Sequence, residues 1–262
     1  MSKPRASLKA CLVAPLPPLP SGVSLYTVGL LAGFARKKPP CELVVITNKS
    51  AMNIENAKGI RLMKAWTRGF GYFFQVLFSI IKEKPDVVHL QHEFFLFGGM
   101  FTAAMFPFLL LSLRLLGIRT VVTIHGVIPK DAANKQFAEA FFVPKNYFLL
   151  RVGLGSITNM ICRFANTIIV HSSSAREALL RDYRIPSSKI RVVHHGIGFL
   201  ETSTPHDMLE NNVLFFGNIT PSKGLEPLIS AFELVKTPNS KLIIAGGAHP
   251  RGQEYFQKKR DI

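Results

Sequence analysis

Residues 85–93 read Pro-Asp-Val-Val-His-Leu-Gln-His-Glu, a short β-branched run that ends in a group of polar side chains. Val87–Leu90 has the composition of a buried strand, and the Pro-Asp pair before it opens that strand. The polar residues Gln91–Glu93 follow directly. Ligands of open α/β sheets bind beyond the carboxyl ends of the strands, so this stretch predicts both a parallel sheet and a binding edge.

The same alternation of short apolar runs and helical spacing extends along most of the chain. It is typical of a parallel, doubly wound sheet, so the predicted fold class is α/β. Ser174 and Glu177 have the spacing of a capping box, which predicts a further helix starting there. The other expected elements are strands at 8–14, 42–47, 59–63, 87–90, 119–124, 167–170 and 189–193, and helices at 23–36, 70–82, 99–116 and 137–164.

A polar segment interrupts this alternation and divides the chain into expected domains. Residues 1–200 form a complete Rossmann-like domain, residues 201–212 a linker, and residues 213–262 the start of a second domain. The second domain is expected to contain strands at 213–217 and 241–245 and helices at 222–236 and 251–260. About 50 residues of this kind make half of a nucleotide-binding fold, too small to bury a full core alone. We therefore expect an incomplete domain.

The positive charge is concentrated in the first domain. The formal net charge is +16, and residues 1–200 hold 25 Lys and Arg against 9 Asp and Glu, whereas residues 201–262 hold 7 of each. Such a surface can face an anionic membrane, nucleic acid or only solvent. No basic run is long enough for a nucleic-acid tail, and no nucleic-acid-binding module is recognisable, so a nucleic-acid partner is not expected.

Cysteine usage and hydropathy bear on the location of the chain. Three widely spaced cysteines fit reduced thiols in a cytoplasmic protein, and the N-terminus does not have the pattern of a signal peptide. Phe94–Leu113 contains no charged residue and is long enough to cross a bilayer. Gly98, Gly99 and Pro107 interrupt it, and a buried or interfacial helix would have the same hydropathy. We expect a cytoplasmic protein, peripheral on the cytoplasmic face of the membrane.

Several polar residues follow predicted strands. Gln91, His92 and Glu93 can hydrogen-bond the hydroxyls of a sugar, although they could instead cap the strand. His125 follows the strand 119–124, where a neutral imidazole can donate to a hydroxyl or accept a proton. Gly22 lies where the loop after the first strand enters a helix, and backbone N–H groups at a helix N-terminus attract anions, although a simple turn would have the same sequence. Two histidines near residue 90 could bind a metal, but no further ligand has suitable spacing, so no metal site is predicted.

The segment Gly217–Gly224 lies between a strand and a helix of the second domain. It contains Lys223, which is electrostatically unusual at a helix N-terminus because cations favour the opposite end. A bound phosphate would account for that lysine. The segment lacks the glycine and lysine order of a P-loop, and no Asp-x-Asp motif is placed to hold a metal.

Taken in order, these motifs resemble glycosyltransferase family four, retaining enzymes of the GT-B fold. The resemblance covers almost the whole chain, and its specificity comes from the ordered set. The matching segments are Pro20–Val23, Gln91–Phe94, Phe97–Gly99, Thr123–Gly126, Ser172–Ser174, His195–Ile197, Gly217–Gly224 and Leu242–Gly247.

The resemblance implies a hexosyltransferase whose first domain binds a glycan or lipid-linked acceptor and whose second domain binds a nucleotide-diphosphate sugar. It implies that transfer retains the anomeric configuration and needs no metal. It implies no cofactor, because the nucleotide-diphosphate sugar is a co-substrate. The implied diphosphate would be gripped between two facing lobes. His125 would contact the transferred sugar as the catalytic residue. Donor binding is implied for Gly22, Gly217, Asn218, Lys223 and Gly224, and acceptor binding for Gln91, His92 and Glu93.

The chain departs from the family pattern in ways that bear on activity. Asn218 stands where the family usually has an arginine, and Ser21 where it has the first glycine of the loop. A pair of glutamates that holds the donor is expected downstream of Ile262. The alternative function is therefore a catalytically incomplete or split GT-B chain. It would act as a partner subunit or acceptor-binding module, with a separate chain supplying the rest of the second domain.

Overall fold

A computed structural model describes residues 8–53, 59–132, 147–196, 211–248 and 252–259. The chain divides into two compact units. The first unit comprises residues 1–130 and 152–199, and the second comprises residues 131–151 and 200–262. Most of the expected linker, residues 201–210, and the first part of the helix expected at 137–164 lie outside the described residues.

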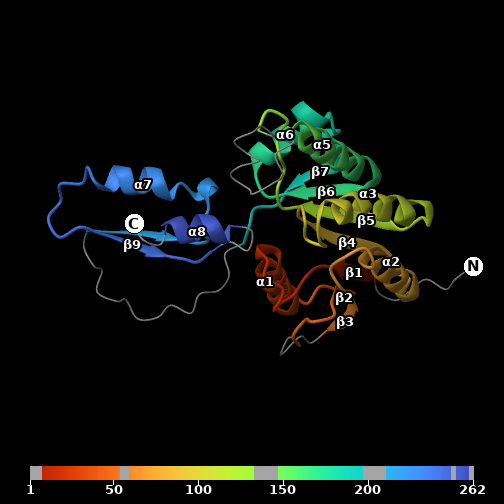
Figure 1. Ribbon diagram of the computed structural model, residues 1–262. Coiled ribbons are helices and arrows are strands. Elements are labelled where there is room, and N and C mark those ends of the chain that lie inside the picture. The colour runs from red at the N-terminus through yellow and green to blue at the C-terminus, as the bar shows by residue number, and fades with distance from the viewer. Residues whose placement is uncertain (1–7, 54–58, 133–146, 197–210, 249–251, 260–262) are drawn as a thin grey trace, which may run out of the picture. The chain divides into compact units, whose positions relative to one another are not determined.

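The first unit contains a seven-stranded parallel sheet in the order β3-β2-β1-β4-β5-β6-β7 (Figure 1). The strand order reverses between β1 and β4, which is where open α/β sheets bind ligands. Every strand begins and ends within three residues of the bounds expected from the sequence. The strands are β1 Leu8–Val13, β2 Cys41–Asn48, β3 Ile60–Trp66, β4 Val87–His92, β5 Arg119–Ile124, β6 Thr167–Val170 and β7 Ile190–Val192.

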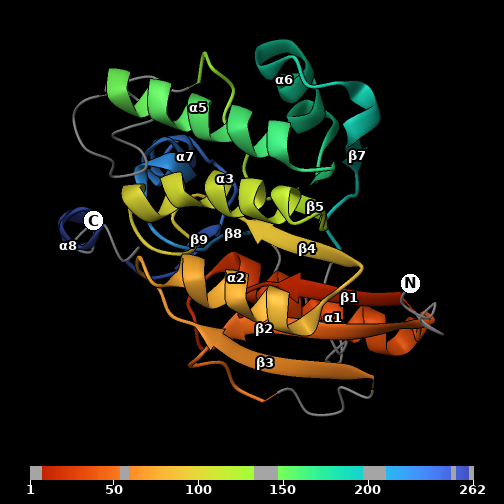
Figure 2. The same cartoon turned by 90° about the vertical axis from the view of Figure 1, so that its right-hand side faces the viewer.

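Helices cover both faces of this sheet, because the central strands are apolar on both sides. In β1, Cys11 and Val13 point into one core and Leu12 into the other. The larger core packs against α2, α3 and α5, and the smaller one against α1 (Figure 2). The α/β prediction is thereby confirmed. The helices are α1 Gly22–Lys37, α2 Tyr72–Glu83, α3 Met100–Leu115, α5 Tyr147–Phe164, which continues across the division between the units, and α6 Ser173–Tyr183; a short 3-10 turn, Ser187–Lys189, precedes β7.

The capping box predicted at Ser174 is wrong. Helix α6 begins two residues earlier because Ser172 is its N-cap, and the Ser172 side chain accepts a hydrogen bond from the Ala175 N–H at 3.1 Å. Ser174 lies within the first turn, where its hydroxyl bonds that of Ser172 at 2.9 Å. Glu177 is then too far along the helix to reach back to the cap.

The uncharged segment Phe94–Leu113 supplies the crossover helix α3 between β4 and β5. Its side chains Phe106, Leu109, Leu110 and Leu113 are buried in the larger core. Pro107 lies within the helix and is also buried. Among the described residues, no helix combines the length and the apolar character that a membrane span requires.

The second unit contains a parallel pair, β8 Asn212–Phe216 and β9 Lys241–Ala245, with α7 Leu225–Phe232 and α8 Gln253–Lys259. The helix expected at 222–236 is wrong at both ends. Residues 221–223 form a 3-10 turn, and Gly224 adopts φ 71° before α7 begins. The two strands expose Leu214, Phe216, Ile243 and Ile244, so their faces are not fully covered.

Candidate functional site

The loop between β1 and α1 meets the end of β4 at the point where the strand order reverses. Ser21 is the N-cap of α1, and its Oγ accepts from the Val23 N–H at 3.1 Å. The same hydroxyl lies 3.5 Å from Glu93 Oε2, and desolvation raises the pKa of the Glu93 carboxyl. A Cβ added to Gly22 would meet no atom within 4 Å, so the space before this helix end is open.

The residues Gln91 and His125 are joined across β4 and β5. His125 Nε2 lies 2.7 Å from Gln91 Oε1, and since that oxygen can only accept, the imidazole donates. The amide nitrogen of Gln91 lies 3.4 Å from His89 Nε2, which in turn is 2.7 Å from Thr123 Oγ1. Gln91 is fully buried and therefore fixes the orientation of His125. Its assignment to the acceptor stays a prediction.

His92 is also buried, with its ring 4.6 Å from that of Phe106 and 5.3 Å from that of Phe94. Its Nδ1 has no hydrogen-bond partner among the described residues. Burial lowers the pKa of His92 to about 3, so the ring is neutral. Of the three residues predicted to bind the acceptor, Glu93 is the one with an exposed side chain.

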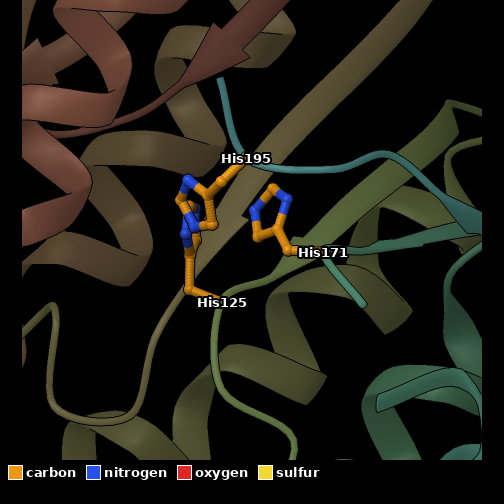
Figure 3. A group of neighbouring side chains, drawn as sticks. All are labelled: His125, His171 and His195. Carbon is orange, nitrogen blue, oxygen red and sulfur yellow. The ribbon is translucent and has the colours of Figure 1, made fainter. Parts of the chain in front are cut away.

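Three histidines gather at the carboxyl ends of successive strands (Figure 3). His125 follows β5, His171 follows β6, and His195 lies three residues beyond β7. One ring nitrogen from each lies within 4.8 Å of those of the other two. Tyr26 of α1 packs against all three rings, with centroid separations of 4.8, 5.2 and 5.1 Å. We call His125, His171 and His195 the histidine cluster.

Two members of the histidine cluster have lowered pKa values. Burial lowers the pKa of His125 to about 3, with a further contribution from His171 and His195. Partial burial and His171 also lower the pKa of His195. Burial lowers the pKa of the neighbouring His89 to about 4. At neutral pH these imidazoles offer nitrogen lone pairs and N–H donors rather than positive charge.

Sequence reasoning did not bring this cluster together. It singled out His125, named His195 only as part of a motif, and did not name His171 or Tyr26. The signal was present, because each histidine comes within three residues after a predicted or observed strand end. Parallel strands bring such positions to one edge. What the pattern could not supply was the direction of each side chain.

In the second unit, the predicted donor-binding residues share one turn after β8. Gly217 adopts φ 126° and donates its N–H to Ala245 O at 3.0 Å. Asn218 and Lys223 are exposed, and the Gly224 N–H closes the 3-10 turn on Pro221 O at 3.3 Å. Sequence reasoning placed Gly246 in a matching segment but did not foresee its close contact, since a Cβ there would lie 1.9 Å from the carbonyl oxygen of Gly217.

Each unit thus groups its own share of the predicted residues. Gly22, Gln91, His92, Glu93 and His125 meet at the carboxyl edge of the seven-stranded sheet. Gly217, Asn218, Lys223 and Gly224 share the turn of the second unit.

The seven-stranded Rossmann-like sheet and the second α/β unit define a GT-B fold, and the class is confirmed by solved structures. The catalytic domain of starch synthase IV from Arabidopsis thaliana, bound to ADP and acarbose, aligns over 97% of this chain and 71% of its own, with TM-score 0.57 and 12% identity. UDP-GlcNAc 2-epimerase from Neisseria meningitidis, bound to UDP-GlcNAc, aligns over 96% and 69%, with TM-score 0.54 and 11% identity.

The family follows from the sequence itself. The model of Glycosyltransferase Family 4 matches residues 20–198, and the chain belongs to that family. The search of curated proteins found no match. The chain is therefore a glycosyltransferase by family, and its general chemistry is sugar transfer.

Proposed function

We propose that this glycosyltransferase moves a hexose from a nucleotide-diphosphate sugar to a hydroxyl group of a glycan or lipid-linked acceptor at the membrane surface. The transfer retains the anomeric configuration of the sugar. The observation that carries the proposal is the placement of His125. In a family-four chain, this imidazole lies just after β5 at the carboxyl edge of the sheet and is held by buried Gln91 of β4. Its ring also packs against Tyr26 of α1, the helix that begins at Gly22.

The role proposed for His125 follows from its hydrogen bonding. Because Nε2 donates to Gln91, the lone pair of the neutral ring is on Nδ1. That nitrogen can accept a hydrogen bond from a hydroxyl of the transferred sugar. Gln91 prevents the ring from rotating away, and such fixed orientation is what makes a polar group effective in a transition state.

The role proposed for the second unit is to bind the donor diphosphate. The exposed ammonium of Lys223 would pair with it, and glycines at 217 and 224 allow a close backbone approach. Asn218 would add a hydrogen bond without charge. Stabilisation of the leaving diphosphate would then be the main catalytic contribution of this turn. Structures of the same fold that contain ADP or UDP-GlcNAc support a nucleotide-linked donor.

An apolar surface on α2 and α3 supports the membrane part of the proposal. The two helices lie side by side (Figure 2), and Phe70 contacts Phe101 at a centroid distance of 6.4 Å. Basic side chains at the ends of these helices are exposed and suit an anionic lipid surface. The apolar side chains that are more than half exposed are Phe70, Phe74, Phe78, Phe101, Phe108, Leu115 and Leu116, and the basic ones are Arg68, Lys82, Lys84 and Arg114.

The membrane proposal is tested with vesicles of phosphatidylglycerol and phosphatidylcholine. Replacing Phe74 and Phe78 together by Ser should weaken binding at least ~10-fold, because two aromatic side chains no longer enter the interface. Leu25→Ser is the matched control, since Leu25 is exposed on α1. Equal binding of the double variant and this control would remove α2 and α3 from the proposal.

The catalytic proposal is tested in a chain that carries a complete donor domain. Lys223→Ala should weaken binding of a nucleoside diphosphate by about 1–3 kcal/mol, as expected for a lost charge-assisted hydrogen bond. His125→Ala should lower kcat more than it lowers donor affinity. Measured turnover and affinity that are unchanged in both variants would contradict the site assignment.

The alternative is a chain that works only with a separate partner. The observation that favours it is the exposure of Leu214, Phe216, Ile243 and Ile244, since strands of parallel sheets are normally covered on both faces. A chain of this kind would bind acceptor but no nucleotide sugar by itself. Calorimetry of the 262-residue chain with a nucleotide sugar distinguishes the two functions.

A further inference from the structure

The three rings of the histidine cluster pack against one another. His171 and His195 have ring centroids 3.9 Å apart, and His125 and His171 have centroids 4.9 Å apart. One nitrogen from each ring lies within 4.8 Å of the others. We propose that His125, His171 and His195 bind one divalent transition-metal ion, with Zn²⁺ as the best fit.

The hydrogen bonds of His171 direct a lone pair into the cluster. Its Nδ1 donates to the Val193 carbonyl oxygen at 2.8 Å, which leaves the lone pair on Nε2. That Nε2 is buried and has no hydrogen-bond partner among the residues the structure describes. Metal-binding histidines typically donate their other ring N–H to a carbonyl or carboxylate in this way, which fixes the tautomer and the ring orientation.

His125 has an equivalent arrangement. Its Nε2 donates to Gln91 Oε1 at 2.7 Å, so its Nδ1 is the nitrogen with the lone pair. Two of the three rings are therefore held by polar atoms outside the cluster while the opposite nitrogen remains available. Gln91 is itself buried, so the support for His125 is rigid.

The distances suit a small ion after one modest adjustment. Zn–N bonds of about 2.0–2.1 Å in tetrahedral geometry place ligand nitrogens roughly 3.4 Å apart. Closing the cluster from a maximum of 4.8 Å requires a shift of about 1.4 Å at most. His195 is exposed and follows the last strand of the sheet, so rotation of its side chain can supply this movement.

The chemistry of the three ligands selects the ion. Imidazole nitrogens suit Zn²⁺, Cu²⁺, Ni²⁺ and Co²⁺, whereas Mg²⁺ and Ca²⁺ require oxygen ligands. Three imidazole ligands leave a fourth coordination position for water or another group. Because Nδ1 of His125 would bind the ion, metal binding would compete with its contact to sugar. That consequence rests on the proposed function, whereas the metal site does not.

The test is metal titration of the full chain, prepared without a histidine tag. Co²⁺ should produce visible d–d absorption at one equivalent, and Zn²⁺ should displace it. His195→Ala and His171→Ala should each weaken Zn²⁺ binding more than about 10-fold, since each removes a ligand. Circular dichroism confirms folding, and His195 is exposed, so its replacement leaves the core unchanged.

His194→Ala is the matched control, because His194 is an exposed neighbour outside the cluster. It should leave Zn²⁺ affinity within about twofold of the unmodified chain, far less than the loss of a ligand. Wild-type affinity in His195→Ala, or an equal loss in His194→Ala, would overturn the proposal and indicate adventitious binding by surface histidines. Absence of any saturable Co²⁺ spectrum would also overturn it.

Discussion

The two ends of the seven-stranded sheet use polar side chains in opposite ways. At the amino-terminal end, Lys9 of β1 and Arg61 of β3 both pair with Glu83, which ends α2. Lys9 Nζ lies 2.9 Å from Glu83 Oε2, and Arg61 Nη1 lies 3.1 Å from Glu83 Oε1. At the carboxyl-terminal end, the histidine cluster brings three imidazole rings together with no carboxylate among them.

The difference lies in how completely the polar atoms are satisfied. The charges of Lys9, Arg61 and Glu83 are paired with one another, and Glu42 lies 3.8 Å from Lys9 and 3.6 Å from Arg61. At the other end, buried nitrogens of His92 and His171 have no partner among the described residues. Each buried polar atom without a partner lowers the free energy of unfolding by roughly 1–3 kcal/mol. The amino-terminal end therefore stabilises the fold, while the carboxyl-terminal end retains unsatisfied groups at a candidate binding site.

The largest expected effect on stability comes from breaking the ion pairs of Glu83. Glu83→Gln should lower the free energy of unfolding by about 2–4 kcal/mol, because it leaves two cations beside a neutral amide in a nearly buried position. Urea denaturation measures the loss. Glu42→Gln is the control, and since Glu42 is half exposed it should cost less than about 1 kcal/mol.

Zinc affinity of Glu83→Gln should remain that of the unmodified chain, because the ion pairs and the cluster lie at opposite ends of the strands. A loss of stability no larger than in Glu42→Gln would break the proposed division between a stabilising end and a binding end.

The second-largest expected effect is a pH dependence of the free energy of unfolding. The hydrogen bond from Arg61, opposed by burial and aided by Lys9, lowers the pKa of Glu83 to about 2. In the unfolded chain this pKa is near 4.5. The contribution of the carboxylate is thus complete above pH 4.5 and is lost as pH falls toward 2. The stability difference between the unmodified chain and Glu83→Gln should shrink between about pH 5 and about pH 3. A difference that stays constant over this range would contradict the pairing.

The sequence predicted the sheet well because its strands are buried on both faces. Residues such as Val44 and Val45 pack into opposite cores, so a continuous β-branched run marks the strand without further context. Helix ends were less predictable. Ser172, Ser173 and Ser174 are chemically alike, and the three-dimensional path after β6 decides that Ser172 caps the helix.

The candidate site was predictable to the extent that topology determines it. Gly22, Glu93 and His125 each follow a strand, and parallel strands place such positions at one edge. His171 and Tyr26 required side-chain directions, because they meet only through their rings, 5.2 Å apart, one just after β6 and the other on α1. Gly246 was not predictable for another reason, because its requirement for glycine comes from the close backbone of Gly217, which lies far earlier in the chain.

The smallest expected effect on stability belongs to the carboxyl-terminal end. His171→Ala loses the hydrogen bond to the Val193 carbonyl, but Val193 is half exposed, so water can replace it. The same change removes a buried nitrogen without a partner among the described residues, which is a gain for folding. The net change in the free energy of unfolding should stay within about 1 kcal/mol. Urea denaturation of His171→Ala and Glu83→Gln under the same conditions compares their free energies of unfolding directly. If His171→Ala were as destabilising as Glu83→Gln, His171 would be a structural residue and the contrast between the two ends would fail.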